Sequence, residues 1–412
     1  MVKIRPQRGV SILEILISVA VISLIFPPVL ELLFNFVRPT SFQNNSQTIF
    51  NQIFDHESVN KKYTCDNLFD SLEGATDSVS PKSITLKIRA ELGLATSSSS
   101  VVTGVSIQNQ NIFITANSSS TTEPDIYNIT TRQYTDTGPG ITVLKQFGPY
   151  FIAANSGVKN QIQIIRKNDL SVYKTFIIPG SNSTTNPITK SFTVARGLLF
   201  IGTEKSVLPE IFIFDIFSGQ VISSIETGYG VNDLYVLGNL LFIASPRDPE
   251  VEVFDISYLG NPQKVATYDA PGGSGNGKTF DIQNQKLLLG RTRGGNELLA
   301  LNLIQNSSGS TSNNALNPIS SIELYAEQKI GWSIDRIAAF RDSLANTYLL
   351  LLTNDSQKEL QIYKYRADHG PEGYNLIYSY NLPSRATDFA CSKKALYVSI
   401  ENLDTPLVEF EF

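Results

Sequence analysis

The sequence is poor in the residues that most often carry out chemistry. It has two cysteines, two histidines, one tryptophan and one methionine among 412 residues, and only 17% of its residues are charged. Metal ions such as zinc are usually held by clusters of cysteine and histidine. Cys65, Cys391, His56 and His369 are too few and too scattered for such a cluster, so we predict no metal site. Neither histidine has a recognisable serine or aspartate partner in the sequence. We therefore predict no cofactor and no enzyme activity.

Long basic stretches are also lacking. No run is longer than Lys61-Lys62 or Lys393-Lys394, the net charge is −5 and the isoelectric point is about 5.3. Nucleic-acid-binding domains usually carry a concentrated positive charge, so we predict no nucleic-acid partner. The length is compatible with two or three domains at roughly 100 to 200 residues each, or with a longer single unit such as a propeller.

The N-terminus contains a long apolar run. Three basic residues precede an apolar segment from Val10 to about Phe36, which is interrupted by Glu14, Glu31 and Asn35. As a helix, this segment would be roughly 40 Å long, enough to cross a hydrocarbon core of about 30 Å. Because the basic residues come first, we predict a cytoplasmic N-terminus and an extracytoplasmic remainder.

Glu14 is the unusual residue of this segment. A carboxylate near the centre of a membrane helix costs about 2.5 to 3.5 kcal/mol unless it finds a partner. The pattern of a basic leader, Gly9, Val10 and a glutamate five residues after that glycine resembles the N-terminal signal of type IV prepilins and pseudopilins. The resemblance implies that a prepilin peptidase cleaves after Gly9 and methylates Val10, where the family usually has Phe or Met. It also implies that Glu14 pairs with the terminal amine of a neighbouring pilin subunit.

Two simpler interpretations of the same segment remain open. It could be a plain membrane anchor, or a secretory signal removed at the small residues Ser18-Val19-Ala20. The apolar run continues well past Ala20, and neither alternative explains Glu14. On the prepilin interpretation the protein lies in the cytoplasmic membrane before assembly and then at the cell surface or in a pilus.

The region before the repeats divides into a leader at 1–9, a pilin-like helix at 10–63 and a linker at 64–80, with the transmembrane part ending at about residue 37. Pro27-Pro28 should kink the helix. In an oxidising compartment Cys65 and Cys391 can form a disulfide, which would stabilise by roughly 4 to 5 kcal/mol in the chain-entropy model. Two separate free thiols are the alternative.

From residue 81 to 412 an internal repeat indicates a mainly β fold. An apolar strand recurs seven times, and each copy is followed 12 to 14 residues later by a second run. The spacing of 42 residues between Phe200 and Phe242 is typical of a four-stranded propeller blade. The first strands of these pairs are 111–114, 150–153, 198–201, 240–243, 286–289, 348–351 and 395–398. We therefore predict a seven-bladed β-propeller, preceded by the long N-terminal transmembrane helix.

Two of the repeats, 210–216 and 250–257, resemble LVIVD-type propeller repeats. The last repeat stops at Phe412, on its third strand. A lone strand at 83–88 precedes the first blade, and we predict that it completes the seventh blade and closes the ring.

Three local motifs suggest chemistry. Residues 272–279 match the P-loop pattern letter for letter, but a strand follows where a P-loop needs a helix, so we interpret them as an inter-blade loop. Asp215 and Asp255 follow third strands, where aspartate commonly accepts turn amides. Trp332 and Arg336 lie near a first strand that would line the central channel. The tryptophan is more simply a core residue, but the two could contact a sugar or peptide.

Together these features predict a minor or tip subunit of a type IV pilus that displays an extracellular propeller for adhesion or for binding a surface protein or glycan. A membrane-tethered propeller enzyme or sensor is the alternative, as is a pseudopilin of a type II secretion system. The membrane, the prepilin peptidase and other pilin subunits are the expected partners.

Overall fold

The computed structural model describes most of the chain from residue 100 onwards. The described residues are 81–84 (backbone only), 100–108, 110–117, 124–138, 140–156, 161–182, 184–271, 275–283, 286–305, 319–342, 346–365, 373–392 and 395–411. The predicted leader, N-terminal helix and linker lie outside these residues. Within the described ranges, no helix is long and apolar enough to cross a membrane.

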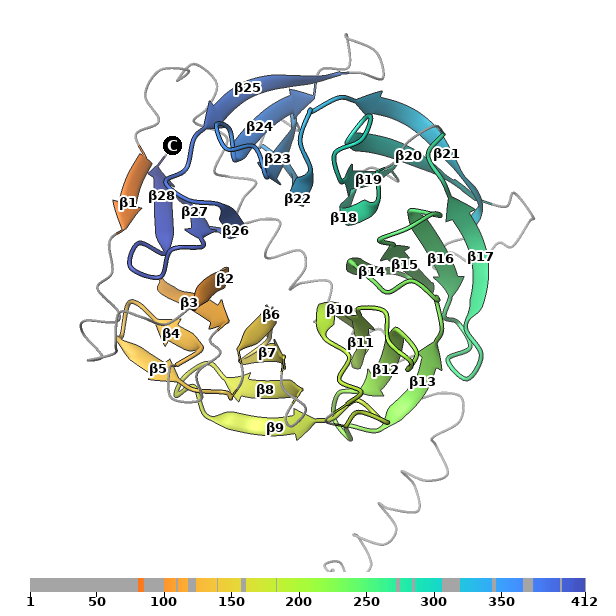
Figure 1. The fold of residues 1–412 in the computed structure, drawn as a ribbon, viewed down its shortest axis with the longest axis horizontal. Coiled ribbons are helices and arrows are strands. Elements are labelled where there is room, and N and C mark those ends of the chain that lie inside the picture. Colours follow the sequence, from red (N-terminus) through yellow and green to blue (C-terminus); the bar gives the residue numbers. More distant parts are fainter. Residues whose placement is uncertain are drawn as a thin grey trace, which may run out of the picture. The chain divides into compact units, whose positions relative to one another are not determined.

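The described residues between 81 and 411 form a seven-bladed β-propeller, which confirms the propeller part of the predicted fold (Figure 1). Each blade is an antiparallel sheet of four strands, and the inner strand of one blade lies next to the inner strand of the following blade. The sequence of each blade runs from the inner strand, beside the ring axis, to the outer strand at the rim. The one exception is the seventh blade, whose outer strand precedes all the others in the sequence.

Each blade contributes four strands, ordered from the ring axis to the rim. Blade 1 consists of β2 (Val101–Gln108), β3 (Asn111–Asn117), β4 (Ile126–Asn128) and β5 (Gln133–Thr135), and blade 2 of β6 (Ile141–Phe147), β7 (Tyr150–Asn155), β8 (Ile162–Arg166) and β9 (Val172–Phe176). Blade 3 consists of β10 (Thr189–Ala195), β11 (Leu198–Thr203), β12 (Ile211–Asp215) and β13 (Val221–Ile225), and blade 4 of β14 (Asp233–Leu237), β15 (Leu240–Ala244), β16 (Val251–Asp255) and β17 (Gln263–Tyr268). Blade 5 consists of β18 (Gly277–Gln283), β19 (Lys286–Arg291), β20 (Leu298–Gln305) and β21 (Ile319–Gln328), and blade 6 of β22 (Ile334–Arg341), β23 (Thr347–Thr353), β24 (Leu360–Tyr365) and β25 (Tyr374–Tyr380). Blade 7 consists of β26 (Ala386–Cys391), β27 (Ala395–Ile400), β28 (Leu407–Glu411) and β1 (Pro81–Ile84).

The second strands are the seven apolar runs of the repeat. All five residues of β15 and all seven of β23 are buried, because each of these strands is covered on both faces by the neighbouring blades. Aromatic side chains join the blades to one another. The rings of Phe113 and Phe151 meet edge to face with centroids 4.7 Å apart, and those of Phe340 and Phe389 do so at 6.3 Å. The core is therefore made of apolar clusters that fill the gaps between neighbouring blades.

The ring is closed by β1, which pairs with β28 in an antiparallel register from Pro81 opposite Phe410 to Ile84 opposite Leu407. The sequence predicted a closing strand at 83–88, so the strand in the structure begins two residues earlier, and residues 85–88 lie outside the described part of the chain. Cys391, on β26 of the same blade, is disulfide-bonded. Its predicted partner, Cys65, lies outside the described residues, so the pairing stays a prediction.

A buried polar residue holds the connection between successive blades. In six blades the residue immediately before the third strand is an acid or amide that is at most 6% exposed, namely Asp125, Gln161, Glu210, Glu250, Glu297 and Glu359. In each blade its side-chain oxygen accepts a hydrogen bond from the backbone N–H two residues after the outer strand ends, at 2.6 to 3.0 Å. These contacts fix the chain where it turns back from the rim to the ring axis.

Candidate functional site

The inner strands share an irregularity at one face of the ring. We call this the mouth face, the face at which all inner strands begin. In six blades the register between the first and second strands shifts near the start of the inner strand, while in the remaining blade the pairing is regular from Asp233. The residues left without a Cα partner are Thr103, Thr142, Lys190, Lys278, Asp335 and Thr387. Such bulges change the direction of a side chain and are frequent beside binding sites.

The charged bulge residues of blades 5 and 6, Lys278 and Asp335, meet charged side chains next to the bulges of blades 6 and 7. Lys278 Nζ pairs closely with Asp335 Oδ1, and Arg385 Nη2 donates to Asp335 Oδ2 at 3.2 Å. Arg385 Nη1 also contacts Glu401 Oε1 at 3.3 Å, and Arg336 Nε lies 3.7 Å from Asp388 Oδ1. We call these six residues, Lys278, Asp335, Arg336, Arg385, Asp388 and Glu401, the mouth cluster.

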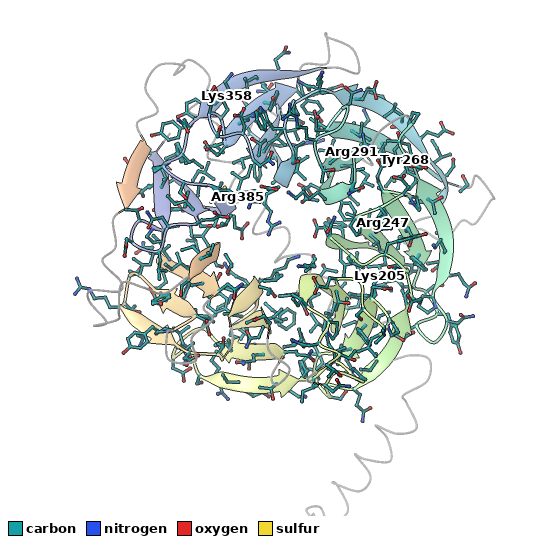
Figure 2. All side chains as sticks on the ribbon, viewed as in Figure 1. Lys205, Arg247, Tyr268, Arg291, Lys358 and Arg385 are labelled. Atoms are coloured by element: carbon teal, nitrogen blue, oxygen red, sulfur yellow. The ribbon has the colours of Figure 1, made fainter. Side chains whose placement is uncertain are left out.

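The cations of the mouth cluster are more exposed than Asp335, the carboxylate that Lys278 and Arg385 share. The Arg385 and Arg336 side chains are 53% and 45% exposed, whereas that of Asp335 is only 10% exposed. Figure 2 shows Arg385 beside the central opening of the ring. Asp335 therefore lies beneath a layer of positive charge that faces solvent near the ring axis.

The surroundings of Lys278 are electropositive. Burial, together with the positive charges of Arg385 and Arg336, lowers the pKa of Lys278 to about 8. Asp335 is shared by Lys278 and Arg385, while Arg385 also pairs with Glu401 and Arg336 lies near Asp388, so the cluster as a whole contains three cations and three carboxylates.

Asp388 is held at the seam between the last and first blades. A side-chain carbon added to Gly104 on β2 would lie 3.4 Å from Asp388 Oδ2 and 3.1 Å from Thr115 Oγ1. The glycine thus allows the inner strand of blade 1 to approach Asp388 closely, which draws this carboxylate towards blade 1.

Asp233 is an inner-strand carboxylate of a different kind. It accepts hydrogen bonds from Ser191 Oγ at 2.8 Å and from Thr279 Oγ1 at 3.1 Å, which lie on the two neighbouring blades. Its oxygens also accept from the backbone N–H groups of Leu234 and Phe280. Because all four donors are neutral, we interpret Asp233 as a structural link between blades.

A second acidic group occurs between blades 4 and 5. Carboxylate oxygens of Asp248, Glu250 and Asp269 lie within 4.8 Å of one another. Glu250 is fully buried, and burial raises its pKa. However, Arg291 pairs closely with Glu250 Oε1, and the Ala270 N–H donates to Oε2 at 2.6 Å. We assign no metal to this group, since Arg291 already supplies the positive charge that Glu250 requires.

The residues singled out in the sequence are distributed as follows. Gly9, Val10, Glu14 and Cys65 lie outside the described residues, as do His56 and His369. Asp215 Oδ1 accepts from the N–H groups of Phe217 and Ser218, and Asp255 Oδ1 accepts from Ser257, which confirms their role in turns.

Two predictions about local motifs need correction. Gly277, Lys278 and Thr279, the end of the P-loop-like stretch, belong to inner strand β18 rather than to a loop. Trp332, two residues before β22, is half-buried rather than a core residue; the guanidinium of Arg293 lies over its ring at 4.7 Å, whereas Arg336 joins the mouth cluster.

No protein-family model matches this chain, and comparison with curated proteins found no match. Solved structures do resemble it. The computationally designed Ika8 protein has a TM-score of 0.52 at 10% identity, and U3-55K has 0.52 at 11%; in both cases 76% of this chain and 96% of the other are covered. A chain of the mitotic checkpoint complex has a TM-score of 0.51 at 12% identity, over 73% of this chain and 81% of its own. Identities this low show the propeller fold alone.

Of the mouth cluster, only Arg336 was recognisable from the sequence as a candidate contact residue. Lys278 was hidden in a stretch that resembled a phosphate-binding loop, and Arg385, Asp388 and Glu401 stand far from it in the sequence. The missing information is the register, because a shift of one residue decides which side chain faces the ring axis.

Proposed function

We propose that this protein is a minor or tip subunit of a type IV pilus and that its propeller is the binding domain. The arrangement of Gly9, Val10 and Glu14 at the start of the apolar segment supports the pilin part of the proposal. The charged, solvent-facing mouth cluster supports the binding part, since ligand sites are frequent in the mouths of β-barrels, and a propeller likewise arranges its strands around a central channel.

The size of the propeller favours a minor subunit. The ring occupies residues 81–411, most of the chain. A head of this size on every subunit would crowd a helical filament, whereas one copy at the tip or at intervals has room to meet a ligand. Equal amounts of this protein and of the major subunit along a purified filament would contradict this part of the proposal.

Mass spectrometry of the mature N-terminus, from a native host, tests the pilin part. We expect a chain that starts at a methylated Val10. An intact Met1 would indicate a plain anchor, and a start after Ala20 would indicate a removed signal peptide. In a second test, Glu14→Ala should prevent incorporation into filaments, while Glu31→Ala in the same apolar segment serves as the control.

A tethered sensor or enzyme is the competing function. It would need the propeller and a membrane attachment but no contact between N-terminal helices. Absence of the wild-type protein from any filament, together with unchanged ligand binding or catalysis by the Glu14→Ala protein, would favour this alternative.

A further inference from the structure

We propose that the mouth cluster binds an oxyanion of the ligand, a carboxylate or phosphate group, through Arg336, Arg385 and Lys278. This inference rests on the proposal that the propeller is a binding domain. It adds the chemical class of the ligand and the residues that contact it.

The first support is convergence. Lys278, Arg336 and Arg385 come from blades 5, 6 and 7, and they meet because each repeat returns the chain to the ring axis. Bulges at Lys278 and Asp335 direct these side chains out of the regular pleat. Arg336 follows the bulge directly. Three cations are thus presented together at the mouth face.

The second support is the unused hydrogen-bonding capacity of the two arginines. A guanidinium has five N–H donors in a planar fork that matches carboxylate and phosphate oxygens. Arg336 uses Nη1 to donate to the Asp335 carbonyl oxygen at 3.1 Å, and Arg385 uses Nη1 and Nη2 for Glu401 and Asp335. Both side chains are about half exposed, so an incoming oxyanion can reach the remaining donors.

The third support is that one internal ion pair is weak. The Arg336 Nε to Asp388 Oδ1 distance of 3.7 Å exceeds hydrogen-bond length. An exposed pair of this kind contributes little stability. A ligand oxyanion that makes a true hydrogen bond can therefore replace Asp388 at Arg336, while the close Lys278–Asp335 pair stays in place beneath it.

The test measures binding to the full-length chain in detergent by isothermal titration calorimetry. The probes are inorganic phosphate and a short oligogalacturonate, with the methyl-esterified oligomer as the neutral counterpart. We expect saturable binding of at least one anionic probe and no binding of the neutral oligomer. Tighter binding of phosphate identifies a phosphorylated ligand, and tighter binding of the oligogalacturonate identifies a carboxylated one.

Four variants assign the binding to the mouth cluster. Arg336→Gln and Arg385→Gln should each weaken binding about 10-fold to 100-fold, the range for a hydrogen bond to a charged group. Asp388→Asn should strengthen binding about 2-fold to 5-fold, because it removes a carboxylate that competes with the ligand for Arg336. This range corresponds to the free energy that an exposed ion pair contributes. Arg247→Gln is the matched control, because Arg247 is exposed on blade 4, away from Arg385 (Figure 2).

Several results would overturn the inference. The first is that neither anionic probe binds, and the second is that neither arginine variant weakens the binding. The third is that Arg247→Gln lowers the affinity as much as the arginine variants of the mouth cluster do, which would indicate diffuse surface charge. If Arg385→Gln does not fold, Arg385→Lys retains the charge without the planar fork. A gain of affinity with Asp388→Asn cannot result from misfolding. N-terminal processing is independent of these measurements, so a failure of the pilin proposal and a failure of anion binding are distinguishable.

Discussion

Replacing Glu297 with alanine removes the carboxylate that holds the connection between blades 5 and 6. Glu297 is 1% exposed, and its Oε2 accepts hydrogen bonds from the Ile330 and Gly331 N–H groups at 2.9 and 2.8 Å. Gly331 has a positive φ of 88°, a conformation that other residues adopt only at a cost. In the variant both amides lose their charged acceptor, at a turn whose backbone conformation glycine adopts without strain.

The expected loss follows from these two bonds. A hydrogen bond to a charged group contributes about 1.5 to 3 kcal/mol. Water can replace part of this, because the connection is only partly buried. We therefore expect Glu297→Ala to reduce the free energy of unfolding by about 2 to 4 kcal/mol. Glu297→Gln keeps one acceptor oxygen and should lose about 1 kcal/mol or less. Blade 2 already uses an amide at this position, since Gln161 Oε1 accepts from the Ile178 N–H at 2.7 Å.

Urea unfolding of the full-length chain measures both losses. Trp332 follows Gly331 directly, so its fluorescence reports the same turn in the folded state. Glu323→Ala, at an exposed position on the adjoining strand β21, is the control and should change neither signal. A loss below about 1 kcal/mol for the alanine variant, or equal losses for the alanine and glutamine variants, would refute the role of the carboxylate.

Two further predictions concern burial. Burial raises the pKa of Asp125 from 3.8 to about 7, so the folded state favours the protonated acid. The free energy of unfolding of the wild type should therefore fall relative to that of Asp125→Asn as the pH rises from 4 to 7. Parallel pH dependence of the two unfolding free energies would contradict this. At Gly202 an added side-chain carbon would lie 2.5 Å from Val231 Cγ1. Gly202→Ala should therefore lower the free energy of unfolding by about 1 to 3 kcal/mol, measured by thermal unfolding. Gly260→Ala is the control: it lies on an outer turn with only the flexible Tyr258 side chain nearby, and it should be nearly neutral.

The blade count could be predicted because its signal is local. Second strands such as β15 and β23 are buried on both faces, and this requires an uninterrupted apolar run that is visible in the sequence. Asp215 and Asp255 could likewise be assigned to turns, because their carboxylate oxygens accept hydrogen bonds from backbone N–H groups only two or three residues further along the chain.

The buried acids before the third strands could also have been found. Glu210, Glu250 and Glu359 occupy the same position in the repeat, immediately before an apolar run, and aligning the seven repeats would have shown it. The mouth cluster could not have been found in this way. Lys278 and Arg385 become neighbours only through strand register and ring closure, and neither leaves a signal in the local sequence.

Closure by β1 determines how the ring carries mechanical load. Tension that travels along the chain to residue 81 enters the propeller through a strand of four residues whose only sheet partner is β28. With the predicted Cys65–Cys391 disulfide formed, tension from residues before 65 reaches β26 through that bond. With the disulfide reduced, the whole force passes through the β1–β28 pairing, and β1 is the first element that a strong pull would detach. The seventh blade would then keep three strands and expose the edge of β28. The seam thus lies on the outer side of the seventh blade, whose inner strand and its neighbouring turns carry Arg385, Asp388 and Glu401 of the mouth cluster.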